Sequence, residues 1–178
     1  MGQFATIIAD AAERSQGLAA KLLVGVTQPI FARKPQLQRD GKPFVVDTNH
    51  AAFVYGHLAI YPARLLTMMK MNPAALATPE AYTELFKAGA PCQDDIEGTI
   101  YPKMEEIVGY FNKGYAGLLS ALRGVDDALL LEANPDEQRR QFFPTIGHAA
   151  LFLTNNHVMM HLGQVSAWRR CYGLPSAM

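Results

Sequence analysis

The sequence has no surplus of charge of either sign and no long apolar run. Its 16 lysine and arginine residues balance 16 aspartate and glutamate residues over 178 positions. DNA and RNA binders usually need a basic surface that neutralises phosphates, so this balance argues against a nucleic-acid partner. No stretch approaches the roughly 20 apolar residues of a membrane-spanning helix. We therefore expect a soluble protein with no membrane partner.

Cysteine is nearly absent. Cys92 and Cys171 are the only two, they lie far apart in the chain, and neither belongs to a CxxC pair. No signal peptide precedes them, so the expected compartment is the reducing cytoplasm, with both thiols as inert structural residues. The chain is instead rich in apolar residues, at 49%, with 18% charged residues. This composition predicts one packed domain over residues 1–178.

Apolar residues recur at three- and four-residue spacing in four long segments, which is the period of an amphipathic helix. The predicted helices cover about 4–30, 49–71, 99 or 101 to 123, and 145–171. Asp47 and Thr48 are suitable caps for the second helix, and Thr145 for the fourth. Pro62 removes a backbone donor from the second helix, so we expect a kink there.

The connections are predicted from proline and glycine. Residues 27–43 hold several helix breakers and read as a long connection, and a second one passes Gly89. A short extra helix should follow Thr78, which can cap it, with Pro79 in its first turn. No segment shows the two-residue alternation of a strand. The predicted fold class is therefore all-α: a four-helix bundle with two long connections and a short extra helix.

The chemistry is concentrated in the last predicted helix. His157 and His161 are four residues apart, so both imidazoles lie on one helix face, where they can bind one metal ion. Gln164 continues that face and can orient a ligand or hydrogen-bond a metal-bound water. The surrounding residues are largely apolar, so two polar rings there need partners that a metal supplies. The alternative is a pair of core histidines bonded to backbone carbonyls.

A third ligand must come from a facing helix, and the second predicted helix offers two candidates. His57 lies well inside that helix among apolar residues, whereas His50 lies at its N-terminal end and is expected to be solvated. We therefore prefer His57, with His50 as its rival. His148 precedes His157 by more than two helical turns and is predicted to be a capping or surface residue.

The run His157-Val-Met-Met-His161-Leu-Gly-Gln164, followed by arginine and a Gly-Leu-Pro tail, resembles the HxxxHxGQ signature of DinB-like proteins. Gly56-His57-Leu58 resembles the first-ligand motif of the same superfamily. The resemblance implies an up-down-down-up four-helix bundle that often forms a homodimer. It also implies a divalent metal ion held by His57, His157 and His161. Relatives include thiol-dependent transferases and isomerases that use mycothiol or bacillithiol.

Three neutral imidazoles leave a metal ion its full positive charge and an open coordination position, as in catalytic sites. Such an ion lowers the pKa of a bound water or thiol. The leading hypothesis is a metal-dependent enzyme, either a thiol-dependent S-transferase or a hydrolase, with zinc or nickel as cofactor. The expected partner is a small-molecule substrate, for example a low-molecular-weight thiol.

Two further residues of the second predicted helix are candidates for substrate contact. Arg64 lies seven residues after His57, so it shares roughly the same face and can attract an anion, while Tyr61 can donate a hydrogen bond. The alternative, without a role in substrate binding, is that Arg64 is an ordinary solvated arginine and Tyr61 an ordinary core tyrosine. Two other functions stay open for the whole chain: a non-catalytic metal-binding stress-response protein, and a structural dimerising bundle without metal.

Overall fold

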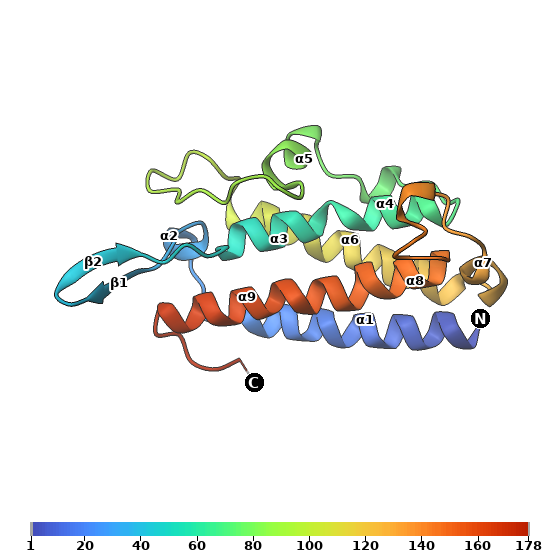
Figure 1. The fold of residues 1–178 in the computed structure, drawn as a ribbon, viewed down its shortest axis with the longest axis horizontal. Coiled ribbons are helices and arrows are strands. Elements are labelled where there is room, and N and C mark those ends of the chain that lie inside the picture. The colour runs from blue at the N-terminus through green and yellow to red at the C-terminus, as the bar shows by residue number, and fades with distance from the viewer. Residues whose placement is uncertain (1, 178) are drawn as a thin grey trace.

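The computed structural model describes residues 2–177, and most of them are helical (Figure 1). The bundle is built from α1 (Gln3–Leu22), α3 (Ala51–Ala59), α4 (Tyr61–Met68), α6 (Met104–Gly124), α8 (Ile146–Leu151) and α9 (His157–Cys171). Shorter elements are α2 (Gln28–Phe31), η1 (Ala74–Leu76), α5 (Glu80–Phe86), α7 (Asp127–Leu131) and η2 (Glu137–Arg139). Within residues 2–177, none of the helices has the length and apolarity needed to cross a membrane.

Four rods form the bundle: α1, α3 with α4, α6, and α8 with α9. α1 packs against α6 and α9, and α3 packs against the same two helices from the other side. In Figure 1, α1 and α9 run toward the end that carries the hairpin, whereas α3, α4 and α6 run away from it. The order is therefore up-down-down-up, as the family resemblance implied. Because α3 and α6 run in the same direction, residues 69–103 must return along the whole bundle, and α5 lies on this return.

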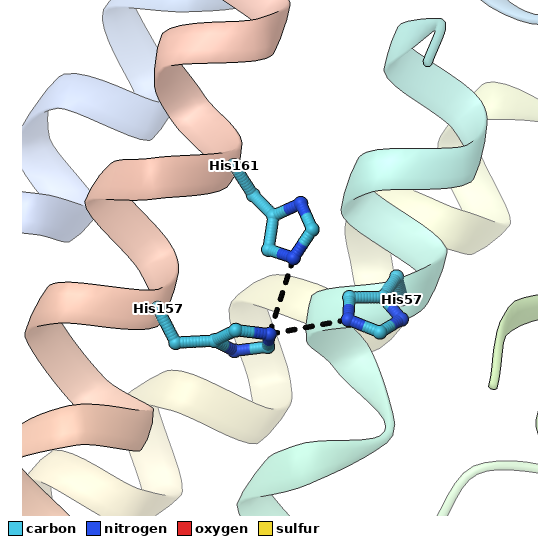
Figure 2. A group of neighbouring side chains, drawn as sticks. All are labelled: His57, His157 and His161. Atoms are coloured by element: carbon cyan, nitrogen blue, oxygen red, sulfur yellow. Dashed lines mark hydrogen bonds between the residues drawn. The ribbon is translucent and has the colours of Figure 1, made fainter. Parts of the chain in front are cut away.

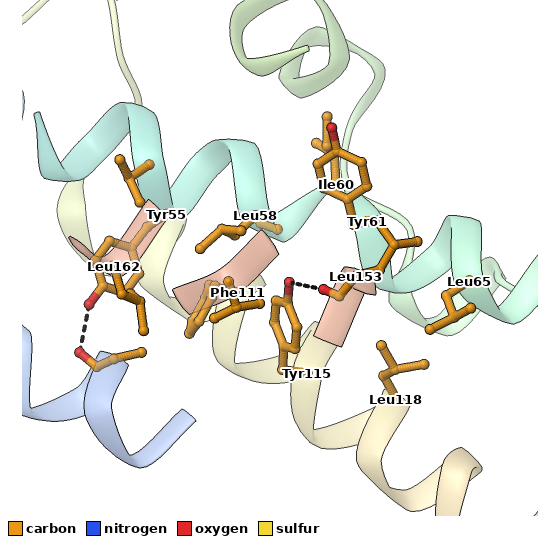
Figure 3. Packing of buried hydrophobic residues seen from close by; sticks show 14 of the residues in the cluster. Tyr55, Leu58, Ile60, Tyr61, Leu65, Phe111, Tyr115, Leu118, Leu153 and Leu162 are labelled. Atoms are coloured by element: carbon orange, nitrogen blue, oxygen red, sulfur yellow. Dashed lines mark hydrogen bonds between the residues drawn. The ribbon is translucent and has the colours of Figure 1, made fainter. Parts of the chain in front are cut away.

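The core lies between the four rods and contains large aromatic side chains. Tyr55, Phe111 and Tyr115 are almost completely buried and contact one another edge-on or tilted. Burying a hydroxyl is costly unless it is hydrogen-bonded. Accordingly, the Tyr55 hydroxyl donates to the Ala19 carbonyl at 2.6 Å and the Tyr115 hydroxyl to the Leu153 carbonyl at 3.4 Å (Figure 3). These bonds join the second and third rods to α1 and to the fourth rod.

The second rod is broken where proline predicted a kink. α3 ends at Ala59 and α4 begins at Tyr61, so Pro62 falls in the first turn of α4, where its missing N–H costs nothing. The helical segment also starts later than the predicted residue 49. Its N-cap is His50, whose side chain accepts a hydrogen bond from the Phe53 N–H, and not Asp47 or Thr48.

The fourth rod contains a change of register that the sequence pattern did not predict. Thr145 caps α8, as expected, by accepting a bond from the His148 N–H at 3.3 Å. Between α8 and α9, η3 (Phe152–Asn156) is a π-helical turn, which holds more residues per turn than an α-helix. The Asn155 side chain donates to the Ser15 hydroxyl at 2.9 Å and to the Ala11 carbonyl at 3.2 Å, so the π turn is attached to α1.

The prediction that the chain has no strands was wrong. Residues 27–43 were predicted as an irregular connection, but they hold α2 and most of a two-stranded antiparallel hairpin of β1 (Gln36–Arg39) and β2 (Lys42–Val45). Asp40 and Gly41 form its turn, and both have positive φ, as a tight hairpin requires. Nearly every strand residue is exposed, so no alternating pattern appeared in the sequence. The first helix also ends earlier than predicted, at Leu22 and not near Ile30.

The remaining boundaries differ by a few residues. α6 begins at Met104, after the predicted Thr99 or Tyr101, because the Asp95 carboxylate accepts the backbone N–H groups of residues 99–101 and holds them as a turn. The short extra helix is present as α5, but Pro79 is its N-cap and Thr78 makes no capping bond. A further short helix, α7, was missed; the Asp126 side chain caps it.

Candidate metal centre

Three imidazole rings meet between α3 and α9 (Figure 2). His57 comes from α3, and His157 and His161 come from successive turns of α9. Nε2 of His157 lies 3.2 Å from Nε2 of His57 and 3.1 Å from Nε2 of His161. One potential ligand atom from each of the three residues falls within 4.8 Å of the others, and all three side chains are buried. This cluster can hold a metal ion.

A close approach between α3 and α5 positions His57. A Cβ on Gly56 would lie 2.4 Å from Cε1 of Phe86, so only glycine lets the Phe86 ring pack this tightly on α3. The approach brings the Phe86 carbonyl within 2.6 Å of His57 Nδ1. His57 therefore takes its orientation from the end of a helix 29 residues further along the chain.

Hydrogen bonds on the outer nitrogens fix the tautomers of two rings. His57 Nδ1–H donates to the Phe86 carbonyl, and His161 Nδ1–H donates to the Gln164 side-chain oxygen at 3.0 Å. Each ring thus keeps an unprotonated Nε2 directed at the centre of the cluster. A histidine that binds a metal commonly donates its other N–H in this way, which sets the ring orientation and makes the ligand more basic.

The spacing of the inner nitrogens fits a single ion. A tetrahedral metal with bonds of about 2.0 to 2.1 Å separates two ligand nitrogens by about 3.3 Å. The two Nε2 distances in the cluster are 3.1 and 3.2 Å. Without an ion, His157 Nε2 can offer one proton to two neighbouring lone pairs, so the three rings are not mutually satisfied. The His157 Nδ1 is buried and has no hydrogen-bond partner among residues 2–177, so no outer contact orients this ring as it does the other two. A metal ion can accept a lone pair from each of the three inner nitrogens. The donor set therefore fits a divalent cation better than a set of core hydrogen bonds.

Burial keeps the three rings in the form that binds metal. Removal from water, with a smaller effect of the neighbouring rings, lowers the pKa of His57 to about 4 and that of His157 to about 3. Burial also lowers the pKa of His161, against the effect of Gln164. Neutral imidazole is the metal-binding species, so near neutral pH no proton has to be displaced.

A pocket of about 360 Å³ opens onto the cluster. The three histidines line it, together with apolar side chains such as Phe53 and Met160 and polar ones such as Asn49. Lys87 stands at the pocket, but its ammonium group is paired with Glu84 at 2.6 Å. An ion held by the rings would therefore face a space large enough for a small molecule.

His50, the other candidate for the third ligand, makes hydrogen bonds outside the cluster with both ring nitrogens. Its Nδ1 accepts the Phe53 N–H at 3.1 Å, and its Nε2–H donates to the Gln93 carbonyl at 2.8 Å. The expectation that His50 is solvated was wrong, because the ring is completely buried. It caps α3 and attaches the return connection. Both nitrogens are occupied, so His50 has no lone pair for a metal in this conformation.

The other candidate residues fall in distinct places. Gln164 contacts His161 and does not line the pocket, so of its two predicted roles the structure favours orienting a ligand. Tyr61 lines the pocket, and its ring lies edge-on to His57 and His157. Arg64 is exposed, with its guanidinium 5.2 Å from the centre of the Tyr61 ring. His148 is exposed, as predicted, and contacts Thr145.

Two contacts of the cluster were not predicted from the sequence. The Phe86 carbonyl is a backbone group, and such groups leave no signal in a sequence. Asn49 donates to the Gln164 side-chain oxygen at 3.1 Å and so completes the set of bonds behind His161. The only signal for Asn49 was its position as a polar residue directly before an apolar segment.

The comparisons with known proteins agree with this geometry. The family model described as the DinB superfamily matches residues 11–165, which include all three histidines and most of the bundle. A search of curated proteins found no match. With the helical bundle in place and the match spanning most of its length, the chain belongs to the DinB superfamily.

Proposed function

We propose that this protein is a metal-dependent enzyme in which His57, His157 and His161 hold one divalent ion. The observation that carries the proposal is the convergence of three imidazole nitrogens on one point beside a pocket. A three-nitrogen site leaves a coordination position open for an exogenous group. When bound, the ion acts as a Lewis acid that lowers the pKa of a coordinated water or thiol.

The residues of the chain orient the ligands and provide a pocket beside them. Phe86 and Gln164 fix two of the imidazoles, so the ligands need not reorganise when an ion or substrate arrives. The pocket volume of about 360 Å³ accommodates a small organic molecule, which supports a low-molecular-weight thiol as the activated nucleophile, with water as the hydrolytic alternative.

Zinc and nickel are the proposed ions, since imidazole ligands suit both. The test is a turnover screen of metal-loaded and chelated protein against electrophilic substrates, with several low-molecular-weight thiols or with water alone. We expect metal-dependent thiol transfer that falls to background in His157→Ala. Product formation without added thiol would identify a hydrolase. Thiol transfer that is equal in the chelated and loaded protein would contradict the proposal.

A non-catalytic metal protein is the second candidate, because the ligands come from two rods and an ion would join α3 to α9. A ligand that binds only the folded chain stabilises it by about 2.7 kcal/mol at a concentration one hundred times its Kd. Metal-dependent thermal stabilisation accompanied by no turnover in the full screen would favour this function over the enzyme.

We also propose that the protein is a homodimer. The exposed apolar side chains Phe4, Ile7 and Leu131 lie around a shallow groove formed by α1, α7 and α8 and offer a contact surface. Light scattering of the purified protein tests this. A mass that stays monomeric at all concentrations would contradict it.

A further inference from the structure

A second pocket, of about 290 Å³, lies next to the metal pocket on the side of α4 and η2. Tyr61 lines both pockets, so the two pockets adjoin at this residue. The centre of the Tyr61 ring lies 4.7 Å from that of the His157 ring and 5.2 Å from the Arg64 guanidinium. A molecule of modest length can therefore reach from the histidines to Arg64.

The second pocket carries uncompensated positive charge. Arg64 and Arg139 both line it. Arg139 is paired with Asp136, also in the lining, at 3.1 Å. Arg64 has no ion-pair partner among residues 2–177, and its guanidinium lies over the face of the Tyr61 ring. One guanidinium is thus free, and this group binds carboxylates through two parallel hydrogen bonds.

The Tyr61 hydroxyl is the second indication of a ligand. The residue is 8% exposed, and in the described part of the chain its hydroxyl makes no hydrogen bond and is not among the buried polar atoms, so its oxygen is accessible at the pockets. Three other buried tyrosines each have a partner: Tyr55 at Ala19, Tyr82 at Glu106 and Tyr115 at Leu153. Figure 3 shows the Tyr61 ring turned away from the core rings Phe111 and Tyr115. Tyr61 therefore presents a free donor at the pockets it lines.

We propose that the second pocket binds a carboxylate of the small molecule on which the metal centre acts, with Arg64 as the main recognition group and the Tyr61 hydroxyl as an additional donor. The substrate class is then an anionic small molecule, with its reacting group at the histidines and its carboxylate at Arg64. This inference rests on the proposed metal-dependent function. Arg64 and Tyr61 act on binding and specificity.

The test compares two probe thiols of equal length on metal-loaded protein: 6-mercaptohexanoate, which carries a carboxylate, and 6-mercaptohexanol, which is neutral. Metal content is measured first, and binding is then followed by titration calorimetry. A charge-assisted bond at a partly solvated site should favour the carboxylate by about five- to tenfold. Arg64→Gln should remove this preference without changing the affinity for the alcohol or the metal content.

Arg170→Gln is the matched control, because Arg170 is an exposed arginine on α9 that lines neither pocket. It should retain the full preference for the carboxylate, while Tyr61→Phe should reduce it. Metal-loaded protein that binds the two thiols equally, or binds neither, overturns the inference and leaves the metal site standing. A preference that survives in Arg64→Gln also overturns it, since the metal alone would then account for the selectivity. A chain that takes up no metal overturns both proposals.

Discussion

In His57, His161 and His50, the contact made by one ring nitrogen decides what the other can do. In His57 and His161, Nδ1–H donates to an oxygen, which leaves Nε2 as a lone pair directed at the cluster. In His50 the order is reversed, because Nδ1 accepts a backbone N–H and Nε2–H donates. The same residue type, equally buried on the same segment, is thus a candidate ligand at position 57 and a helix cap at position 50.

Gln164 should act on the metal through His161. Replacing it by alanine removes the acceptor of His161 Nδ1–H and the contact with Asn49, so the ring loses its fixed orientation. We expect Gln164→Ala to weaken metal affinity about tenfold or more, as measured by competition with a chromophoric chelator. Gln138→Ala, at an exposed glutamine far from the histidines in sequence, is the control and should bind metal like the original chain. Unchanged affinity in Gln164→Ala would remove Gln164 from the site.

His50 should make the chelated protein sensitive to acid. Burial lowers its pKa from 6.5 to about 4, so as the pH falls the unfolded chain takes up a proton before the folded one does. The contribution of neutral His50 to the free energy of unfolding is therefore complete above about pH 6.5 and is lost progressively as the pH falls toward 4. Between about pH 7.5 and about pH 5 this linkage removes on the order of 2 kcal/mol from the free energy of unfolding.

The comparison is with His50→Asn, whose side-chain oxygen can still cap α3 but does not titrate. Urea unfolding of both chains, with metal removed, should show a smaller loss of stability in the variant between these two pH values. Both chains retain the three clustered histidines, so the difference isolates His50. Equal losses in the two chains would show that His50 is accessible to protons in the folded state.

The residue pattern predicted the pair on α9 because a four-residue spacing has a direct meaning on a helix. It favoured His57 over His50 from the apolar neighbours of His57, but it could not show the contacts that separate the two, because the Gln93 and Phe86 carbonyls come from the return connection. The family resemblance pointed to His57, and the structure places His57 in the cluster. Binding of metal by these three residues stays a prediction.

At the scale of elements, each deviation from an ideal helix lies close to the site. The break around Ile60 falls just after His57, and the π turn η3 ends immediately before His157. π turns often occur at functional sites, because the extra residue changes which side chains face a neighbouring helix. Proline signalled the first deviation in the sequence. Nothing comparable signals a π turn, whose residues Phe-Leu-Thr-Asn-Asn are also compatible with an ordinary helix.

The packing of α5 on α3 is the contact between elements on which His57 depends. In Gly56→Ala the new methyl group would overlap the Phe86 ring, so α5 must move and carry away the carbonyl that orients His57. We expect a loss of roughly 1 to 3 kcal/mol in the free energy of unfolding, from overpacking, together with weaker metal binding.

Gly163→Ala is the matched control for that substitution. A Cβ at Gly163 has no atom within 4 Å, although this glycine lies on α9 between His161 and Gln164. Alanine in the middle of a helix should leave metal affinity unchanged and stabilise the fold by up to about 1 kcal/mol. Denaturant unfolding and metal titration of both variants provide the test. Equal effects in Gly56→Ala and Gly163→Ala would contradict the role given to the α3–α5 contact.

At the scale of the whole molecule, topology brings the ligands together. The up-down-down-up order makes α3 and α9 neighbours, although His57 and His157 are 100 residues apart. Helical periodicity predicted the rods of α1 and α6, which bury one apolar face, whereas α3 is buried on all sides and was predicted from its apolar composition and its caps. The hairpin at residues 36–45 could not be predicted this way, since it projects from the end of the bundle and buries almost nothing (Figure 1).

The central claim is that this bundle holds one divalent ion between α3 and α9. The most direct test is elemental analysis of protein purified without a histidine tag, comparing the original chain with His161→Ala and with His148→Ala, which removes an exposed histidine outside the cluster. We predict about one ion per chain in the original protein and in His148→Ala, and a fall toward background in His161→Ala. Equal metal content in the original protein and His161→Ala would contradict the claim.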